Sequence, residues 1–369
     1  MIPYFILLII PYIFCFIAKT REKRRYIIGS GQLVSSNNLA VQVFFGFLWL
    51  LLACRSVGIG NDTANYKRYF SVYSSQSFAQ IFNGDAESLF RFLNWLIGQL
   101  TDSFQIYLAI VAAITIIPIA VLYKQDRRHS YLKIILFVNM SVFIMLFSGI
   151  RQAIAMSIGL IAYYFVKKKK LITFLITVFI AIGIHQSAFM LFAMYPLYYF
   201  RLRKRNLYII IPLVAIVYIF NRPIFAGLLN IMAFFGTRFD SIASSDTGAI
   251  TMILLFVAFT LFAYIVPDEQ KIDDEFIGMR NYLLLATLLQ CFAPLHTLAM
   301  RMNYYYILFV PVVIPMVLNY VDKKWKQIAK VAEIVMCVFF TGYFVMGIIA
   351  SMETGGALNT VPYIPFWAD

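Results

Sequence analysis

Polar residues border two long apolar runs of the sequence. Arg151 and Gln152 precede the first run, His185 follows the second, and the lysines 167–170 lie between the two. Helices joined by this short turn would be antiparallel, which predicts Arg151 and His185 at one level. A guanidinium suits a pyrophosphate because its planar fork offers paired donors and stays charged. A helix N-terminus at Arg151 would add to that attraction.

Simpler roles are also open to these residues. Arg151 could snorkel to a membrane interface or pair with Asp62 or Glu87. His185 could take a proton from an attacking hydroxyl or donate to a sugar or phosphate oxygen, or it could be a helix-end histidine bonded to a carbonyl. His296 has the same possible roles, supported only by the nearby Arg301.

The stretch RSVGIGNDTANYKRYF, residues 55–70, is rich in turn residues and leads into an amphipathic segment. Asp62 is predicted to cap the following helix, and it could also act as a carboxylate base toward an acceptor hydroxyl. We expect residues 55–103 to form an outward-facing loop with an interfacial helix within 86–103.

Composition sets the fold class. Of the 369 residues, 62% are hydrophobic and 13% charged, which predicts an all-α polytopic membrane protein with a single transmembrane domain over residues 1–369. The apolar segments suggest about twelve spans. They are residues 2–18, 39–54, 104–123, 131–147, 150–166, 171–184, 186–200, 207–220, 249–266, 281–297, 303–320 and 328–349.

Charge is distributed by side of the membrane. Basic connections at 19–25, 124–133, 167–170, 201–205 and 322–326 face the cytoplasm by the positive-inside rule. They account for much of the net charge of +14, so no nucleic-acid partner is expected. Arginines on the opposite side run against that rule, and an anionic ligand would explain them. They are Arg55, Arg68, Arg91, Arg151, Arg222, Arg238 and Arg301, with Arg222 and Arg238 in a second outward-facing loop at 221–248.

Familiar catalytic motifs are missing from the sequence. It contains no Walker A loop, GxGxxG, GxSxG, HExxH, DxD or paired-cysteine zinc pattern, so neither a metal nor another cofactor is expected. An outward-facing enzyme has no ATP or nucleotide sugar to use. An activated donor linked to a lipid pyrophosphate would fit both the compartment and the arginines.

Five segments in this order resemble the EpsG-like branch of the Wzy-type polysaccharide polymerases. They are RSVGIGNDTANY, AESLFRFLN, the pair IRQAIA and IHQSAF, RMNYYYILFVPVVIP and VPYIPFW. The resemblance implies a fold related to the C-type membrane glycosyltransferases. It also implies a bacterial inner-membrane enzyme that joins undecaprenyl-pyrophosphate-linked repeat units at the periplasmic face, making O-antigen or exopolysaccharide.

The resemblance also implies roles for individual residues. Arg151, Gln152, His185, Asp62, Arg55 and Arg301 fall on its motif positions, and Tyr66 follows the glycine-rich turn. The arginine-to-glycine spacing of some O-antigen polymerases is absent, so Arg222 and Arg238 are expected only to guide the glycan. The implied partners are the lipid-linked donor and acceptor, membrane lipid and a chain-length regulator protein.

The resulting hypothesis is glycosyl transfer with a lipid pyrophosphate as leaving group. Arg151 and Arg301 would stabilise the departing pyrophosphate, and His185 or Asp62 would orient or deprotonate the attacking hydroxyl. A lipid-linked oligosaccharide flippase is the main alternative, although transporters tend to carry midplane ionisable groups and two related halves. An O-antigen ligase would use the same donor chemistry.

Overall fold

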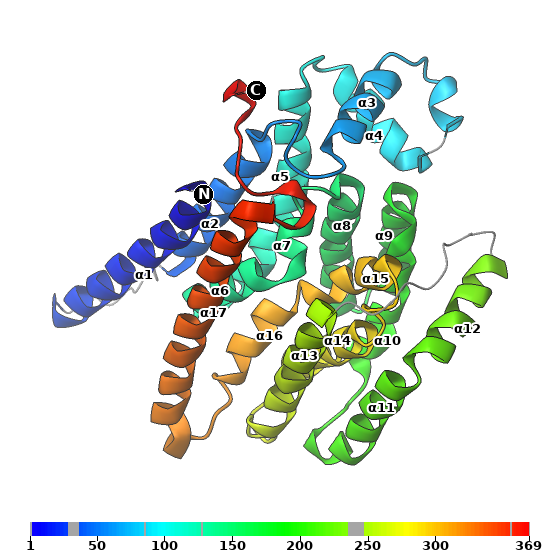
Figure 1. Cartoon of the computed structure of the whole chain (residues 1–369). Coiled ribbons are helices and arrows are strands. Elements are labelled where there is room, and N and C mark those ends of the chain that lie inside the picture. The colour runs from blue at the N-terminus through cyan, green and yellow to red at the C-terminus, as the bar shows by residue number, and fades with distance from the viewer. Residues whose placement is uncertain are drawn as a thin grey trace. The chain divides into compact units, whose positions relative to one another are not determined.

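The computed structural model describes residues 2–28, 37–84, 86–126, 128–234, 247–354 and 356–368. Helices dominate these residues, which contain no β-strand and only one isolated β-bridge, between Arg55 and Pro365 (Figure 1). The chain forms two compact units. Unit 1 comprises residues 1–189 and 331–369, and unit 2 comprises residues 190–330.

Unit 1 combines helix pairs that are consecutive in the chain with pairs that are far apart in it. Its helices are α1 (Ile2–Ile28), α2 (Asn37–Ala53), α3 (Thr63–Ser74), α4 (Ser88–Gly98), α5 (Phe104–Lys124), α6 (Ser130–Asn139), α7 (Ser141–Met145), α8 (Ile150–Lys167), α9 (Leu171–Ile184) and most of α17 (Lys326–Thr354). The pair α8 and α9 packs side by side, as do α2 with α5 and α5 with α8. Helices α3 and α4 form a separate hairpin, in which α4 contacts α9.

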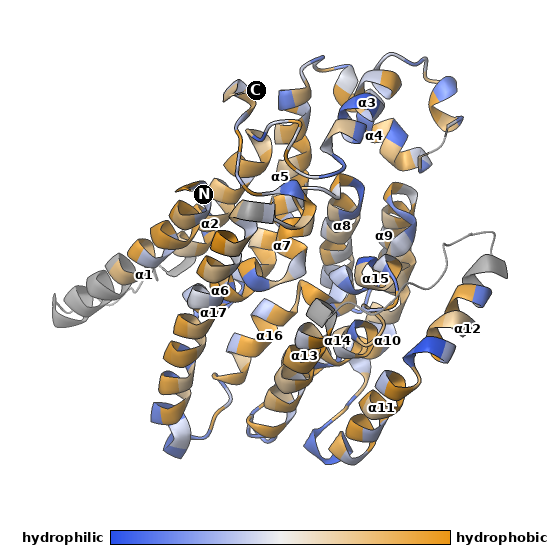
Figure 2. Cartoon of the chain, viewed as in Figure 1, coloured by the Kyte–Doolittle hydropathy of each residue, from blue (hydrophilic) through white to orange (hydrophobic). Residues whose placement is uncertain are grey.

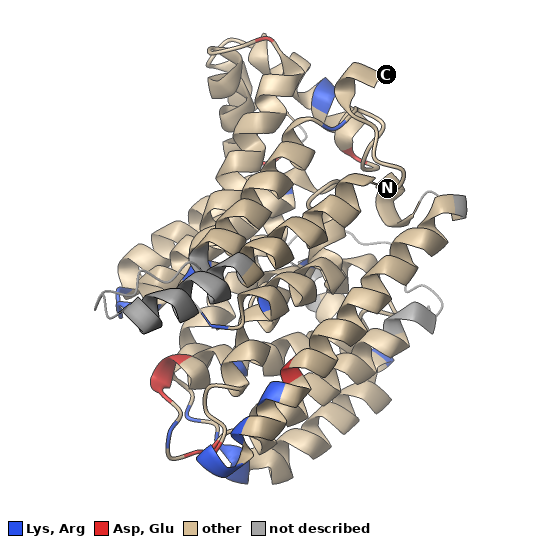
Figure 3. Cartoon of the chain, turned by 90° about the vertical axis from the view of Figure 1, so that its left-hand side faces the viewer, with Lys and Arg blue, Asp and Glu red and all other residues tan. Residues whose placement is uncertain are grey.

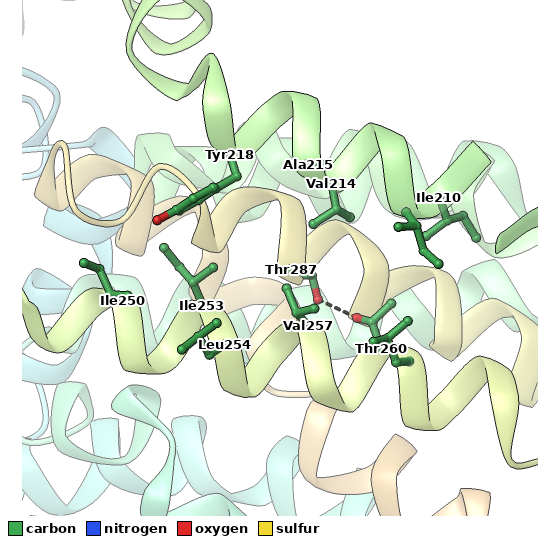
Figure 4. Close-up of a pocket in the computed structure, with 12 residues that line it drawn as sticks. Ile210, Val214, Ala215, Tyr218, Ile250, Ile253, Leu254, Val257, Thr260 and Thr287 are labelled. Carbon is green, nitrogen blue, oxygen red and sulfur yellow. Dashed lines mark hydrogen bonds between the residues drawn. The ribbon is translucent and has the colours of Figure 1, made fainter. Parts of the chain in front are cut away.

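Unit 2 centres on α14. Its helices are α10 (Met194–Tyr199), α11 (Leu207–Ile219), α12 (Asn221–Phe234), α13 (Thr247–Ile265), α14 (Asp274–Gln290), α15 (Thr297–Ile307) and α16 (Val310–Val317). Helix α14 packs against α10, α13, α15 and α16. An apolar groove of about 320 Å³ lies between α11 and α13, where Thr260 and Thr287 form a hydroxyl hydrogen bond of 2.6 Å (Figure 4).

The helices agree with the predicted membrane class. Helical structure occupies each of the twelve predicted segments, in whole or in part. Within the described part of the chain, two helices, Phe104–Lys124 and Lys323–Met352, are long and apolar enough to cross a membrane. Two bent pairs in unit 2 raise this number to four if each is one span: residues 204–219 with 221–230, bent by 77°, and residues 297–307 with 310–317, bent by 48°. The all-α membrane class is thus supported, whereas twelve crossings stay a prediction.

Apolar and charged side chains occupy different parts of the helices. Apolar residues cover the helix bodies in Figure 2, and exposed ones such as Val338 and Phe339 on α17 suit contact with lipid. Lysines and arginines gather in connections and at helix ends (Figure 3). The chain from the end of α8 to α9 carries lysine at each of the positions 167–170. Fully buried cations occur as well. Arg280 pairs with Glu269 at 2.7 Å and donates to the Leu202 carbonyl at 2.7 Å, so its buried charge is paired.

Candidate functional site

Arg151 and His185 meet at a common carboxylate. Arg151 is the second residue of α8, and His185 directly follows α9. Arg151 Nη1 lies 2.7 Å from Glu87 Oε2, and His185 Nδ1 lies 3.2 Å from Glu87 Oε1. The antiparallel pair α8 and α9 therefore places both residues at one level, as predicted, and Glu87 joins them. We call Glu87, Arg151 and His185 the carboxylate cluster.

Close packing of α4 on α9 places Glu87 beside Arg151 and His185. Glu87 immediately precedes α4, and its Oε1 also accepts from the backbone N–H of Gln186 at 3.1 Å. A Cβ on Gly183 of α9 would lie only 2.6 Å from Leu89 Cδ1. A larger residue at this position, two residues before His185, would therefore displace the Leu89 side chain or the helix that carries it.

The charge state of Glu87 follows from its donors. Burial favours the neutral acid, but the hydrogen bond with His185 and the charge of Arg151 outweigh it and lower the pKa of Glu87 to about 2. The carboxylate is therefore ionised at neutral pH.

Aromatic side chains of α3 and α4 surround the guanidinium of Arg151. Its Cζ lies 5.8 Å from the ring centre of Tyr69 and 5.7 Å from that of Phe90, within the range of cation–π attraction. The Arg151 backbone N–H donates to Tyr66 Oη at 3.4 Å. Burial raises the pKa of Tyr66, so this phenol stays protonated. The Arg151 side chain remains 26% exposed, and its Nε has no hydrogen-bond partner among the described residues.

Asp62 lies at the N-cap position of α3, but its side chain makes no capping bond, so the predicted cap is wrong. Its Oδ2 instead accepts from Ser148 Oγ at 3.2 Å, and its N–H donates to the same oxygen at 3.2 Å. Gly60 fixes this turn, because its φ of +84° is unfavourable for other residues and a Cβ there would lie 1.9 Å from the Phe147 carbonyl oxygen. Asp62 is thus tied to the segment that leads into α8.

Arg55, which the sequence predicts to bind the anionic ligand, is enclosed by the protein. It is only 2% exposed, and the C-terminal segment covers it through the bridge to Pro365 and a 2.9 Å bond from Ser56 N–H to the Ile364 carbonyl. Its Nη1 donates to the Leu52 carbonyl at 3.0 Å, and burial lowers its pKa to about 10. The adjoining cavity of about 10 Å³ has room for about one water molecule. Arg55 is therefore not presented to a large ligand in this structure. Gln152 is similarly buried, at 5% exposure.

The remaining predicted residues belong to unit 2 or lie outside the described residues. Arg222 on α12 and Arg301 on α15 are exposed. His296 caps α15, because its Nδ1 accepts from Leu298 N–H at 2.9 Å. The first part of the predicted loop 221–248 is helix α12, and Arg238 lies outside the described residues.

Sequence reasoning identified Glu87 only as one possible partner of Arg151. Its central role has no local signal, since it lies 64 residues from Arg151 and 98 from His185. No group of three or more His, Cys, Asp or Glu side chains suited to a metal ion occurs in the part of the chain that the structure describes.

The fold and the carboxylate cluster define a helical membrane protein with acid–base and cationic groups gathered at the ends of adjoining helices. A family model for the EpsG family matches residues 38–364, nearly the whole chain, and the chain belongs to that family. EpsG is a Wzy-like polysaccharide polymerase family, which confirms the predicted resemblance and gives the general activity as polysaccharide polymerisation. Searches of curated proteins and of solved structures returned no match.

Proposed function

We propose that this protein polymerises oligosaccharide repeat units carried on undecaprenyl pyrophosphate, at the periplasmic face of the bacterial inner membrane. The observation that carries the proposal is the carboxylate cluster, which sets a partly exposed guanidinium beside an imidazole. The cluster lies at the opposite ends of α8 and α9 from the lysine turn 167–170. The positive-inside rule assigns that turn to the cytoplasm, which assigns the cluster to the periplasm.

The reaction would be glycosyl transfer from a lipid-linked chain to one new lipid-linked repeat unit. The acceptor hydroxyl oxygen bonds to the anomeric carbon of the donor sugar, and the bond from that carbon to the phosphate oxygen breaks. The electron pair leaves with undecaprenyl pyrophosphate, and the hydroxyl proton passes to a base. Arg151 would stabilise the charge that develops on the leaving oxygen, where preorganised donors contribute most.

His185 is the favoured base in this scheme, since an imidazole nitrogen can accept a hydroxyl proton and the neighbouring Glu87 carboxylate stabilises the cation that forms. Asp62 is less suited because Ser148 already donates to its carboxylate. Arg55 and Gln152 would act by supporting the helices, because both are buried. Direct contacts of Arg222, Arg238, His296 and Arg301 with the glycan, and of a chain-length regulator with the protein, stay predictions.

Deleting the gene and separating the surface glycan on a gel would test the proposal. For an O-antigen producer, lipid A core carrying a single repeat, with all longer bands gone, is the expected result, because flipping and ligation still operate. Bare core would indicate a flippase or a ligase instead. Complementation with Arg151→Ala should fail to restore long chains. Arg128→Ala is the matched control and should restore them, since this arginine is 63% exposed and lies in a connection between α5 and α6.

A further inference from the structure

The hydrogen bonds of Glu87 determine which nitrogen of His185 carries the proton. An ionised carboxylate can only accept hydrogen bonds, so the 3.2 Å contact between Glu87 Oε1 and His185 Nδ1 requires a proton on Nδ1. In the neutral imidazole, Nε2 then carries the free electron pair. We infer that Glu87 is a positioning residue that holds His185 in the Nδ1–H tautomer and so makes Nε2 the proton acceptor of the reaction. This inference rests on the proposed function, in which an acceptor hydroxyl must lose a proton.

The other contacts of Glu87 enforce the same arrangement. Oε2 accepts from Arg151 Nη1 at 2.7 Å, and Oε1 accepts from the Gln186 backbone N–H at 3.1 Å. Arginine and a backbone amide can only donate. Three donors around the carboxylate stabilise its ionised form, so Glu87 stays the hydrogen-bond acceptor in its contact with His185.

The charged and titratable groups around the cluster are few. Arg151 faces Glu87 from α8, and His185 faces it from the end of α9. Tyr66 of α3 reaches the cluster through the backbone N–H of Arg151, and Asp62 lies close enough to Tyr66 to influence it. Neither Tyr66 nor Asp62 competes for the nitrogen atoms of His185 in any described hydrogen bond.

The proton then has a defined route. The acceptor hydroxyl donates to Nε2 as its oxygen attacks the anomeric carbon, and His185 becomes an imidazolium. Glu87 stabilises that cation through Nδ1–H without accepting the proton itself. The imidazolium later returns its proton to water, which restores the neutral ring.

The chain supplies its own reference signals for a direct test. It contains three histidines. His129 Nδ1 lies 2.8 Å from Glu333 Oε1, which requires a proton on Nδ1, whereas His296 Nδ1 accepts from a backbone N–H, which places the proton of the neutral ring on Nε2. Nitrogen-15 NMR of histidine-labelled protein in lipid nanodiscs at about pH 8 distinguishes these forms, and His129→Gln and His296→Gln assign the signals.

Wild-type His185 should show the Nδ1–H pattern. Glu87→Gln should reverse it. Arg151 and the Gln186 N–H would compete for the carbonyl of the introduced glutamine, and the charged Arg151 is the stronger donor, so the carbonyl would turn toward Arg151 and the NH2 group toward His185 Nδ1. A wild-type ring protonated only on Nε2, a doubly protonated ring, or an unchanged tautomer in Glu87→Gln would overturn the inference. This measurement needs no turnover, so it stands apart from success or failure of the proposed function.

Rates of chain elongation by the purified enzyme give a second test. Reversing the tautomer should cost about 10²- to 10⁴-fold in kcat, the usual contribution of general base catalysis. Glu87→Ala leaves the ring free to adopt either tautomer and should be less impaired than Glu87→Gln. A purely structural role gives the opposite order, since glutamine matches glutamate in shape, and Glu87→Gln at least as active as Glu87→Ala would therefore refute the inference. Asp102→Asn changes an exposed carboxylate of the same segment and should leave the rate unaltered.

Discussion

A substitution at Gly183 can separate α4 from α9 without replacing any residue of the carboxylate cluster. An alanine Cβ at this position would lie 2.6 Å from Leu89 Cδ1 and 2.7 Å from Leu89 Cγ. Carbon atoms in contact normally stand about 3.5–4.0 Å apart, so either the Leu89 side chain leaves its rotamer or the helices part by about 1 Å. Where the helices part, the His185–Glu87 contact of 3.2 Å would exceed the length of a hydrogen bond.

The expected cost falls on activity more than on folding. Overpacking of this kind destabilises by about 1–3 kcal/mol. Replacing glycine by alanine inside a helix returns about 0.5–1 kcal/mol, so the net loss is about 0–2.5 kcal/mol. A base displaced by about 1 Å can slow the reaction about 10²-fold. Gly183→Ala should therefore still fold, but it should elongate chains slowly.

Initial rates with purified enzyme and lipid-linked repeat units, measured beside thermal unfolding, would check this expectation. Adding Leu89→Ala removes the clashing atoms and leaves Leu89 Cβ at 3.3 Å, so the double variant should regain at least about tenfold in rate. Gly46→Ala is the matched control, because its added Cβ meets no described atom within 4 Å beyond its chain neighbours and the backbone of its own helix. A full rate in Gly183→Ala, or a double variant as slow as the single one, would refute the reasoning.

Three other variants test contacts of the same site. Arg151→Lys keeps a positive charge but loses the planar fork, so it should abolish chains longer than one repeat at normal protein level, and normal chain length on a glycan gel would remove Arg151 from the mechanism. Gly60→Ala should lower the free energy of unfolding by about 1–2 kcal/mol because of the positive φ, and further because of the clash with Phe147. An unchanged unfolding midpoint would contradict this. Glu87 has its pKa lowered to about 2, so its stabilising effect is complete above about pH 4.5 and is lost as pH falls toward 2. Glu87→Gln should flatten that part of an acid-unfolding curve, and equal acid slopes in both proteins would count against the ion pair.

The helices were accessible from sequence because long apolar runs determine their positions. The breaks within these apolar runs were harder to predict from the sequence. The predicted segment 131–147 divides into α6 and α7 at Met140, and the segment 303–320 contains the bend between α15 and α16. Pro311 near the start of α16 explains the second break, since proline cannot donate to the preceding turn. The first has no such residue and depends on packing.

The site was predictable to the extent that it follows from the pair α8 and α9. A short turn between apolar runs of similar length is enough to bring Arg151 and His185 to one level. The partner that joins them comes from α4, and only long-range packing around Gly183 and Leu89 selects Glu87 over Asp62. Sequence spacing carries no such information.

The arginines predicted to oppose the positive-inside bias have different structural environments. Arg55 is buried beneath the C-terminal segment, and Arg91 donates to the loop carbonyls of Phe82 and Gly84, so both stabilise the fold around α3 and α4. Arg151 differs because it is paired with a carboxylate, faces aromatic rings and still has 26% of its side chain exposed. An anionic ligand gains from a cation that is both held in place and accessible. Of these three arginines, Arg151 alone combines the two properties, and pairing and exposure, rather than charge alone, are therefore the grounds for proposing it as the pyrophosphate-binding residue.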